Sequence, residues 1–257
     1  MNVTILGSGT STGVPEVGCK CSVCTSHDPH DRRLRCSALI KTDCGNRILI
    51  DCGPDFRQQM LTVPFGSIDG VLLTHEHYDH VGGIDDLRPF CRRGDVPIYA
   101  QADVANAIRN RLPYCFAAHK YPGVPKLVLH EIEAGKEFSL KGDTVLPIRV
   151  WHGRLPILGY RIGAFAYITD MTELPDESLT ALKGITHLVM NALRIDSHPT
   201  HQNLKEALEK VKRIQAITPL EHTYLIHMSH SMGLHEEVNA TLPPAVCLAY
   251  DGLSFDV

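Results

Sequence analysis

The stretch Thr74-His75-Glu76-His77-Tyr78-Asp79-His80 decides how this sequence is interpreted. It directly follows Val71-Leu72-Leu73, an apolar run that predicts a buried strand. The candidate metal ligands stand at i, i+2, i+4 and i+5, which differs from the helical His-x-x-x-His pattern of zincins. In an extended chain the first two histidines point the same way, and Asp79 and His80 then lie in the following turn. Imidazoles and carboxylates bind Zn, Mn or Fe, so the stretch predicts a metal site at a strand end.

Two metal ions need more ligands than this stretch supplies, and three further candidates stand at strand ends. His152, Asp170 and His227 each lie at the end of an apolar run. An acidic group between two cations is a natural bridge, so we expect Asp170 to touch both ions. The sequence therefore predicts two divalent ions, Mn or Zn. The expected ligands are His75, His77, Asp79, His80, His152, Asp170 and His227.

A second cluster has the spacing Cys-x-Cys-x₂-Cys, formed by Cys19, Cys21 and Cys24. Three thiolates in a tight loop can hold one tetrahedral zinc, and a histidine from elsewhere is the expected fourth ligand. An iron–sulfur cluster is the alternative, but it would usually need a fourth cysteine. We expect the other cysteines to be small buried side chains. These are Cys36, Cys44, Cys52, Cys91, Cys115 and Cys247.

Length and composition place the chain among globular proteins. The 257 residues are 44% hydrophobic and show no repeat or long linker, so we expect residues 1–257 to form one domain. The net charge of −4 offers no basic field for a nucleic acid, and we expect no such partner. The first residues lack the basic and apolar regions of a secretory signal, and no apolar run reaches the ~18 residues of a membrane span. We therefore expect a cytoplasmic protein without a membrane partner.

The order of predicted elements favours an α/β fold. Strand patterns span Val3–Leu6, Ala38–Thr42, Arg47–Asp51, Gly70–Thr74, Pro97–Ala100, Lys126–Glu131, Thr144–Val150, Gly159–Ile162, Ala164–Thr169, His187–Asn191, Thr223–Met228, Val246–Tyr250 and Ser254–Val257. Helical patterns span Asp103–Leu112, Asp176–Leu182, Leu204–Ile214 and His235–Thr241, the third with a capping box of Asn203 and Glu206. Such a mixed set suits two packed sheets with helices outside, a four-layer α/β/β/α sandwich.

The motif Thr-His-x-His-x-Asp-His, followed by His, Asp and His at later strand ends, resembles the metallo-β-lactamase superfamily of dinuclear hydrolases. The stretches Gly7–Ser11 and Ile50–Gly53 also match that pattern. The resemblance covers nearly the whole chain and implies the α/β/β/α sandwich. It also implies how the ligands are divided. One ion is held by His75, His77 and His152, the other by Asp79, His80 and His227, and Asp170 bridges them.

Within the superfamily, the cysteine loop, Gly13-Val14-Pro15 and His227-Met228-Ser229-His230 resemble the phosphoribosyl 1,2-cyclic phosphate phosphodiesterase branch, which is related to tRNase Z. That resemblance implies that His227 binds a catalytic metal and that His230 completes a structural zinc site with Cys19, Cys21 and Cys24.

The same branch resemblance implies a general acid in His198-Pro199-Thr200-His201, namely His201. An imidazole with a pKa near neutrality suits proton transfer to a leaving alkoxide. His198 is the alternative for this role, and a solvated loop histidine is the other reading. The residues expected to carry catalysis are thus His201 and the metal-holding Asp79.

The expected function is a dinuclear-metal-dependent phosphodiesterase. Its expected substrate is a small cyclic phosphate diester, such as a phosphoribosyl 1,2-cyclic phosphate or a 2′,3′-cyclic nucleotide. A tRNA 3′-processing endonuclease is the alternative, although no basic inserted arm is visible in the sequence. A non-enzymatic binding protein on the same scaffold is the third hypothesis, which a complete ligand set disfavours. A homodimer stays open.

Two further polar features have two readings each. Arg32, Arg33 and Arg35 form either a solvated cationic face or a clamp for a substrate phosphate. Asp251, next to Gly252, forms a hairpin turn or orients a metal-bound histidine.

Overall fold

The computed structural model describes residues 1–257, with the side chain of Arg93 left aside. The first sheet contains β1 (Asn2–Gly7), β2 (Ser37–Lys41), β3 (Arg47–Ile50), β4 (Gly70–Leu72), β5 (Val96–Ala100), β6 (Leu127–Glu131) and β14 (Ser254–Asp256). The second contains β7 (Phe138–Leu140), β8 (Asp143–His152), β9 (Leu155–Ile162), β10 (Phe165–Ile168), β11 (His187–Asn191), β12 (His222–Ile226) and β13 (Val246–Leu248). The helices are α1 (Phe56–Met60), α2 (Tyr78–Val81), α3 (Ala102–Arg111), α4 (Pro113–Phe116), α5 (Asp176–Ala181), α6 (Leu204–Gln215) and α7 (His235–Asn239).

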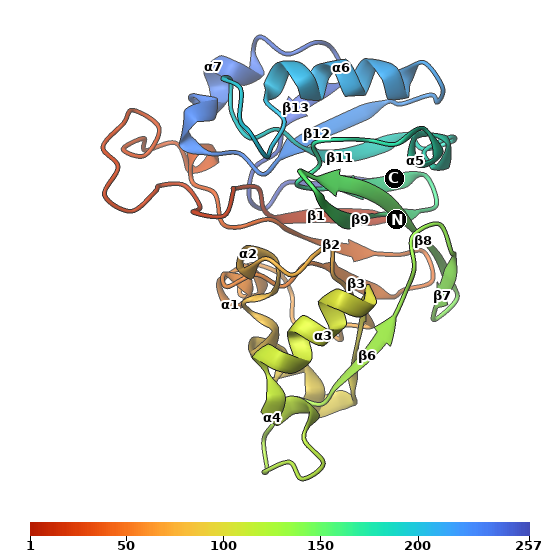
Figure 1. The fold of residues 1–257 in the computed structure, drawn as a ribbon. Coiled ribbons are helices and arrows are strands. Elements are labelled where there is room, and N and C mark those ends of the chain that lie inside the picture. The colour runs from red at the N-terminus through yellow and green to blue at the C-terminus, as the bar shows by residue number, and fades with distance from the viewer.

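The two sheets have mirrored connectivity. The first has the order β14-β1-β2-β3-β4-β5-β6, and the second β13-β12-β11-β10-β9-β8-β7. In each, one part is a run of parallel strands, β3 to β6 in the first sheet and β10 to β13 in the second. In Figure 1, helices α1–α4 lie in the lower half, beside strands β3 and β6 of the first sheet, whereas α6 and α7 lie at the top, over the second sheet, and α5 lies to its right.

Side-chain alternation along the strands creates three hydrophobic layers. Ile48 and Ile50 of β3 join Leu158 and Tyr160 of β9 in a core between the sheets. The intervening Leu49 points the other way, into a core shared with α1 to α4. A third core lies between the second sheet and α5 to α7. The predicted four-layer α/β/β/α sandwich is confirmed.

The elements missing from the sequence prediction are the short ones. Helices α1, α2 and α4 and strand β7 have no more than five residues each, too few for a periodic signal, and such short helices depend on tertiary packing. Strand β9 begins at Leu155, four residues before the predicted start at Gly159. The prediction missed these residues because Pro156 is unusual inside a strand and weakens the sequence pattern. The capping box of α6 is confirmed, since Asn203 and Glu206 each accept the other's backbone N–H.

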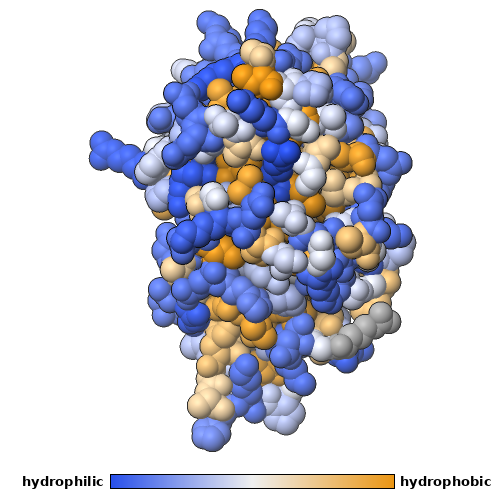
Figure 2. Space-filling model, turned by 90° about the vertical axis from the view of Figure 1, so that its right-hand side faces the viewer, coloured by the Kyte–Doolittle hydropathy of each residue, from blue (hydrophilic) through white to orange (hydrophobic). Residues whose placement is uncertain are grey.

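The prediction that six cysteines are buried is only half right. Cys36, Cys52 and Cys115 are buried, whereas Cys44 is exposed in the turn before β3, and Cys91 and Cys247 are half-buried. On the face in Figure 2, hydrophilic residues are interspersed with small groups of hydrophobic ones, as is ordinary for a globular protein. Within the described part of the chain, no helix is long and apolar enough to cross a membrane.

Candidate metal centre and active site

The histidine-rich stretch lies where the two sheets meet. It follows β4 and runs into the single turn of α2. Two hydrogen bonds attach its start to β9 of the opposite sheet: the Leu158 N–H donates to the Thr74 carbonyl over 3.0 Å, and the Tyr160 hydroxyl donates to the Leu73 carbonyl over 2.5 Å. The stretch is therefore held by both sheets.

Two glycines let α2 approach the turn after β3. A Cβ at Gly53 would lie 2.1 Å from the Asp79 carbonyl oxygen, and a Cβ at Gly83 would lie 2.0 Å from the Gly53 carbonyl oxygen. Neither distance is possible for a real side chain. Glycine at these positions therefore sets how closely Asp79 and His80 approach the neighbouring strand end.

The structure brings all seven predicted active-site ligands together. Groups whose ligand atoms lie within 4.8 Å of one another include His75, His77 and His152, and Asp79, His80 and His227, with Asp170 beside His75 and His80. This division matches the one implied by the superfamily resemblance. The role of these residues as ligands stays a prediction, since the geometry shows proximity only.

Asp170 lies at the centre of the cluster. Its Oδ1 is 3.0 Å from His227 Nε2, and its Oδ2 is 3.2 Å from His80 Nε2. The same His80 Nε2 is 3.2 Å from Asp79 Oδ2. These three partners belong to one ligand group, and Asp170 also has a ligand atom within 4.8 Å of that of His75 in the other group. One carboxylate thus faces both groups of ligands, which is the position required of a bridge.

Three residues at strand ends in this cluster have left-handed backbones. The φ angles are 58° at Asp51, 53° at Asp170 and 58° at His227. Such a conformation is unfavourable for residues other than glycine and is found where the surroundings enforce it, often at functional sites. At Asp170 the following residue is clamped, because the Met171 N–H donates to Asn191 Oδ1 over 2.9 Å and the Asn191 amide donates back to the Met171 carbonyl.

The chemistry of the cluster fits divalent cations. The buried Nε2 atoms of His75, His80 and His227 have no hydrogen-bond partner among the described residues. Buried polar atoms are nearly always satisfied, so these lone pairs call for a ligand. Burial lowers the pKa of His80, but the carboxylates of Asp51, Asp170 and Asp79 outweigh it and raise that pKa well above its ordinary value. Carboxylates also raise the pKa of His227 to about 9 against the effect of burial. The site attracts positive charge.

Asp51 is a site residue that the sequence analysis did not single out. It is fully buried, its Oδ2 accepts from His80 Nδ1 over 2.7 Å, and its Oδ1 accepts from the Thr74 N–H over 2.8 Å. A carboxylate on the far nitrogen fixes the tautomer and orientation of a ligating histidine. The Thr200 carbonyl does the same for His152, accepting from its Nδ1 over 2.9 Å.

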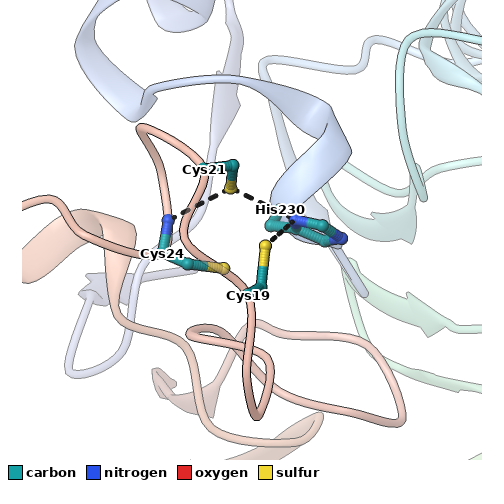
Figure 3. Close-up of side chains that lie close together, drawn as sticks. All are labelled: Cys19, Cys21, Cys24 and His230. Carbon is teal, nitrogen blue, oxygen red and sulfur yellow. Dashed lines mark hydrogen bonds between the residues drawn. The ribbon is translucent and has the colours of Figure 1, made fainter.

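The second predicted metal site is also assembled. Figure 3 shows Cys19, Cys21 and Cys24 of the N-terminal loop with their side chains facing His230, which follows β12. Nδ1 of His230 lies 3.3 Å from the sulfur atoms of both Cys19 and Cys21. The other ring nitrogen, Nε2, lies 3.4 Å from a carboxylate oxygen of Glu16, which the sequence analysis missed.

The thiols of this site have divided pKa values. The Cys24 backbone N–H and His230 lower the pKa of Cys21 to about 6. Burial and the neighbouring sulfur atoms raise the pKa of Cys24 to about 11. Three thiolates therefore need a compensating cation to coexist here, and a tetrahedral zinc supplies one.

The three arginines of the cluster have different surroundings. Arg32 is exposed, as a solvated face requires, Arg35 pairs with Asp55, and only Arg33 departs from both interpretations of the sequence. Arg33 is buried and donates to the Ser8 hydroxyl and the Ala249 carbonyl, so it neither faces solvent nor clamps a substrate. Asp251 lies in a turn, but the predicted hairpin is wrong, because the flanking strands β13 and β14 belong to different sheets. Its carboxylate accepts from the Ser8 and Leu34 N–H groups. Arg33 is therefore not a phosphate clamp, and among the described residues Asp251 has no hydrogen bond to a histidine of the metal cluster.

His201 and His198 are distinguished by position. His201 Nδ1 lies 3.5 Å from Asp170 Oδ1, and its ring stacks on that of His227 with centroids 5.0 Å apart. His198 lies behind it, 5.3 Å from the His201 ring. A cavity of about 480 Å³ is lined by Ser11, His77, Asp79, His152, Gly153, Arg154, Leu155, Asp170, Thr200, His201 and His227. His198 is not among its lining residues.

Comparison with known proteins agrees with this geometry. A family model described as a Beta-lactamase superfamily domain matches residues 46–228. A solved structure described as a new diphosphatase from the PhnP family is 40% identical, covers 99% of this chain and 96% of its own, and superposes with a TM-score of 0.90. The chain belongs to the PhnP family of the β-lactamase superfamily. It is a metal-dependent hydrolase, as the sequence predicted.

Two further proteins resemble this chain over part of their length or in fold alone. A Porphyromonas gingivalis (strain ATCC BAA-308 / W83) protein named octanoyltransferase is 50% identical over 98% of this chain but only 51% of its own length. The chain thus spans about half the length of the curated relatives it matches. The short form of human tRNase Z, 17% identical with a TM-score of 0.69 over 100% of this chain and 99% of its own, shares the fold.

Replacing Asp51 by asparagine should weaken metal binding in this PhnP-family member by about 10- to 100-fold, because His80 loses the charged partner of its Nδ1. Asparagine tolerates the left-handed backbone at this position, so the fold should persist. Titration against a chromophoric chelator measures the affinity. Asp86→Asn, at an exposed carboxylate, is the control. Unchanged affinity in a folded Asp51→Asn variant would show that this contact does not tune the site.

The two histidines of residues 227–230 should have separable effects. His227→Ala should abolish hydrolysis and lose a metal ion from the active site with a small change in melting temperature. His230→Ala and Cys19→Ser should instead lower the melting temperature and lose the zinc of the cysteine site, because structural zinc binding is coupled to folding. Elemental analysis and thermal denaturation measure both, with exposed His222→Ala as control. Loss of hydrolysis in His230→Ala with its zinc and stability intact would reverse the two roles.

Proposed function

We propose that this chain is a phosphodiesterase that uses two divalent ions, Mn or Zn, to hydrolyse a small cyclic phosphate diester. A phosphoribosyl 1,2-cyclic phosphate and a 2′,3′-cyclic nucleotide are the model substrates. The observation that carries the proposal is the position of His201, a proton donor beside the candidate bridge Asp170 in the same cavity. The cavity volume of about 480 Å³ suits a small molecule, not a folded nucleic acid.

The residues proposed to hold the ions are the seven ligands described above, with Cys19, Cys21, Cys24 and His230 holding a structural zinc. When bound, divalent ions in such a site polarise phosphoryl oxygens and provide a nucleophile from water at neutral pH. Thr169 donates a hydrogen bond to Asp170 over 2.7 Å and the Asn191 clamp holds the next residue, so the carboxylate keeps its place between the two groups.

His201 is proposed to protonate the departing oxygen. Burial, and then the positive charge of His227, lower the pKa of His201 to about 3, so the imidazole is neutral in the absence of substrate at pH 7. A phosphate anion beside the ring favours the protonated form and raises that pKa again. Nδ1 of His201 lies 3.5 Å from Asp170 Oδ1, and this carboxylate also favours the protonated ring that would donate to the departing oxygen when the anionic substrate is present.

A diphosphatase activity is the second candidate, because the 40% identical solved structure bears that description. Attack at phosphorus is common to both reactions, and they differ in whether an alkoxide or a phosphate departs. Acyl transfer is not proposed: the octanoyltransferase name belongs to a chain of which this sequence matches 51%. Metal-reconstituted protein assayed with adenosine 2′,3′-cyclic phosphate and with ADP-ribose separates the two candidates. Hydrolysis of ADP-ribose alone would replace the first by the second.

Two substrates with different leaving groups test the proposed role of His201 as a general acid. Bis(p-nitrophenyl) phosphate releases a phenolate with a pKa of about 7, below the ~10 of tyrosine, and needs little protonation. A ribose alkoxide is far more basic. We therefore expect His201→Ala to lose about 10²- to 10⁴-fold in kcat/KM with the cyclic ribose phosphate and much less with the nitrophenyl ester. Metal content, measured in the same samples, should not change.

His198→Ala is the matched control and should affect both substrates little, since His198 does not line the cavity. Equal losses on both substrates in His201→Ala would indicate a metal-binding or positioning role for His201. A loss that depends on the leaving group in His198→Ala, but not in His201→Ala, would exchange the two assignments.

A further inference from the structure

Among the side chains that the structure describes, Arg154 is the one lysine or arginine that lines the candidate active-site cavity. The other ionisable lining residues are carboxylates and imidazoles that belong to the ligand cluster or to His201. No motif drew attention to Arg154 in the sequence, where it lies between Gly153 and a strand.

The position of Arg154 is fixed relative to the metal cluster. Gly153 and Arg154 form the two-residue turn between β8 and β9, and the candidate ligand His152 pairs with Leu155 across it. Gly153 adopts a φ of 59°, and its N–H donates to the Thr172 hydroxyl over 2.9 Å. A short turn of this kind has few alternative conformations. The backbone of Arg154 is therefore held by a short hairpin turn, and its side chain lines the cavity.

Arg154 has no hydrogen bond or ion pair within the described part of the chain. Other arginines near the sheets are engaged: Arg33 binds Ser8 and Ala249, and Arg35 pairs with Asp55 at 3.0 Å. Arg154 is exposed, so its guanidinium is accessible to a ligand from solution. A guanidinium matches a phosphate group through two parallel hydrogen bonds, which gives it both charge and shape selectivity.

We propose that Arg154 binds a second phosphate of the substrate, one that is not the group attacked. This inference rests on the proposed function. The attacked phosphorus of a diester carries one negative charge, which the ligand cluster with its cations can neutralise. A further phosphate on the sugar carries close to two negative charges at neutral pH. Of the described residues that line the cavity, Arg154 alone offers it a lysine or arginine side chain. The preferred substrate is then a small phosphate ester with a second phosphate, on the sugar or in a diphosphate linkage.

A matched pair of substrates tests the proposal: adenosine 2′,3′-cyclic phosphate with and without a 5′-phosphate. The wild-type protein should prefer the 5′-phosphorylated compound. Arg154→Gln should raise the KM for the 5′-phosphorylated compound about tenfold and leave its kcat nearly unchanged. Hydrolysis of the unphosphorylated compound should be nearly unaffected, and Arg154→Lys should recover part of the lost affinity. Arg57→Gln, at an exposed arginine of α1 that lines no cavity described here, is the control. Equal losses on both compounds, or no loss on either of them or on ADP-ribose, would overturn the role of Arg154.

Direct binding keeps this result separate from the proposed activity. Measured by calorimetry, the metal-loaded wild-type protein should bind adenosine 3′,5′-bisphosphate more tightly than adenosine 3′-monophosphate. In Arg154→Gln the ratio of the two dissociation constants should be about tenfold smaller. If no cyclic substrate is hydrolysed but this binding difference is lost in Arg154→Gln, the proposed function fails and the phosphate subsite stands. An effect of Arg154→Gln on ADP-ribose alone would place the second phosphate in a diphosphate linkage. Identical binding of both ligands by wild-type protein would overturn the subsite.

Discussion

Buried negative charge is the constraint on which the rest of the structure depends. Asp51 and Asp170 are almost completely buried, and Asp79 lies next to them where the two sheets meet. Carboxylates in such a place are costly unless cations accompany them. Three further features lie at the same site: the strand ends with left-handed backbones, the close glycine contacts and the imidazole nitrogens without hydrogen-bond partners. Each is explained if cations complete the cluster.

The cysteine site extends this arrangement to the N-terminal loop. His230 belongs to it, and His227, three residues earlier, belongs to the active-site cluster. The segment between them is also fixed by the N-terminal loop, because the Met228 N–H donates to the Ser8 carbonyl and its own carbonyl accepts from the Thr10 N–H. Both candidate centres are therefore anchored on one short segment.

The sequence predicted the parts of the site that carry a local signal. The ligands of residues 75–80 have a specific spacing, and His152, Asp170 and His227 could be found because strand ends converge in a sandwich. Asp51, Glu16 and Asn191 were missed because each acts through a contact with a residue distant in sequence, such as Asp51 with His80. Arg33 was misread for the same reason, since nothing local reveals that Ser8 and Ala249 bury it. The fold was predicted except for its shortest elements, and the single-domain organisation stays a prediction.

The distance along the chain between the parts of the cysteine site has a consequence for synthesis. Cys21 and His230 are 209 residues apart. At the usual ribosomal rate of about 5–20 residues per second, the three thiols wait about 10–40 s for their imidazole partner. During that interval the nascent chain presents an incomplete chelate, open to oxidation or to capture of a thiophilic ion such as copper. If this site holds a zinc ion, as proposed, its loading would depend on the reducing capacity and metal supply around the ribosome as well as on the finished fold.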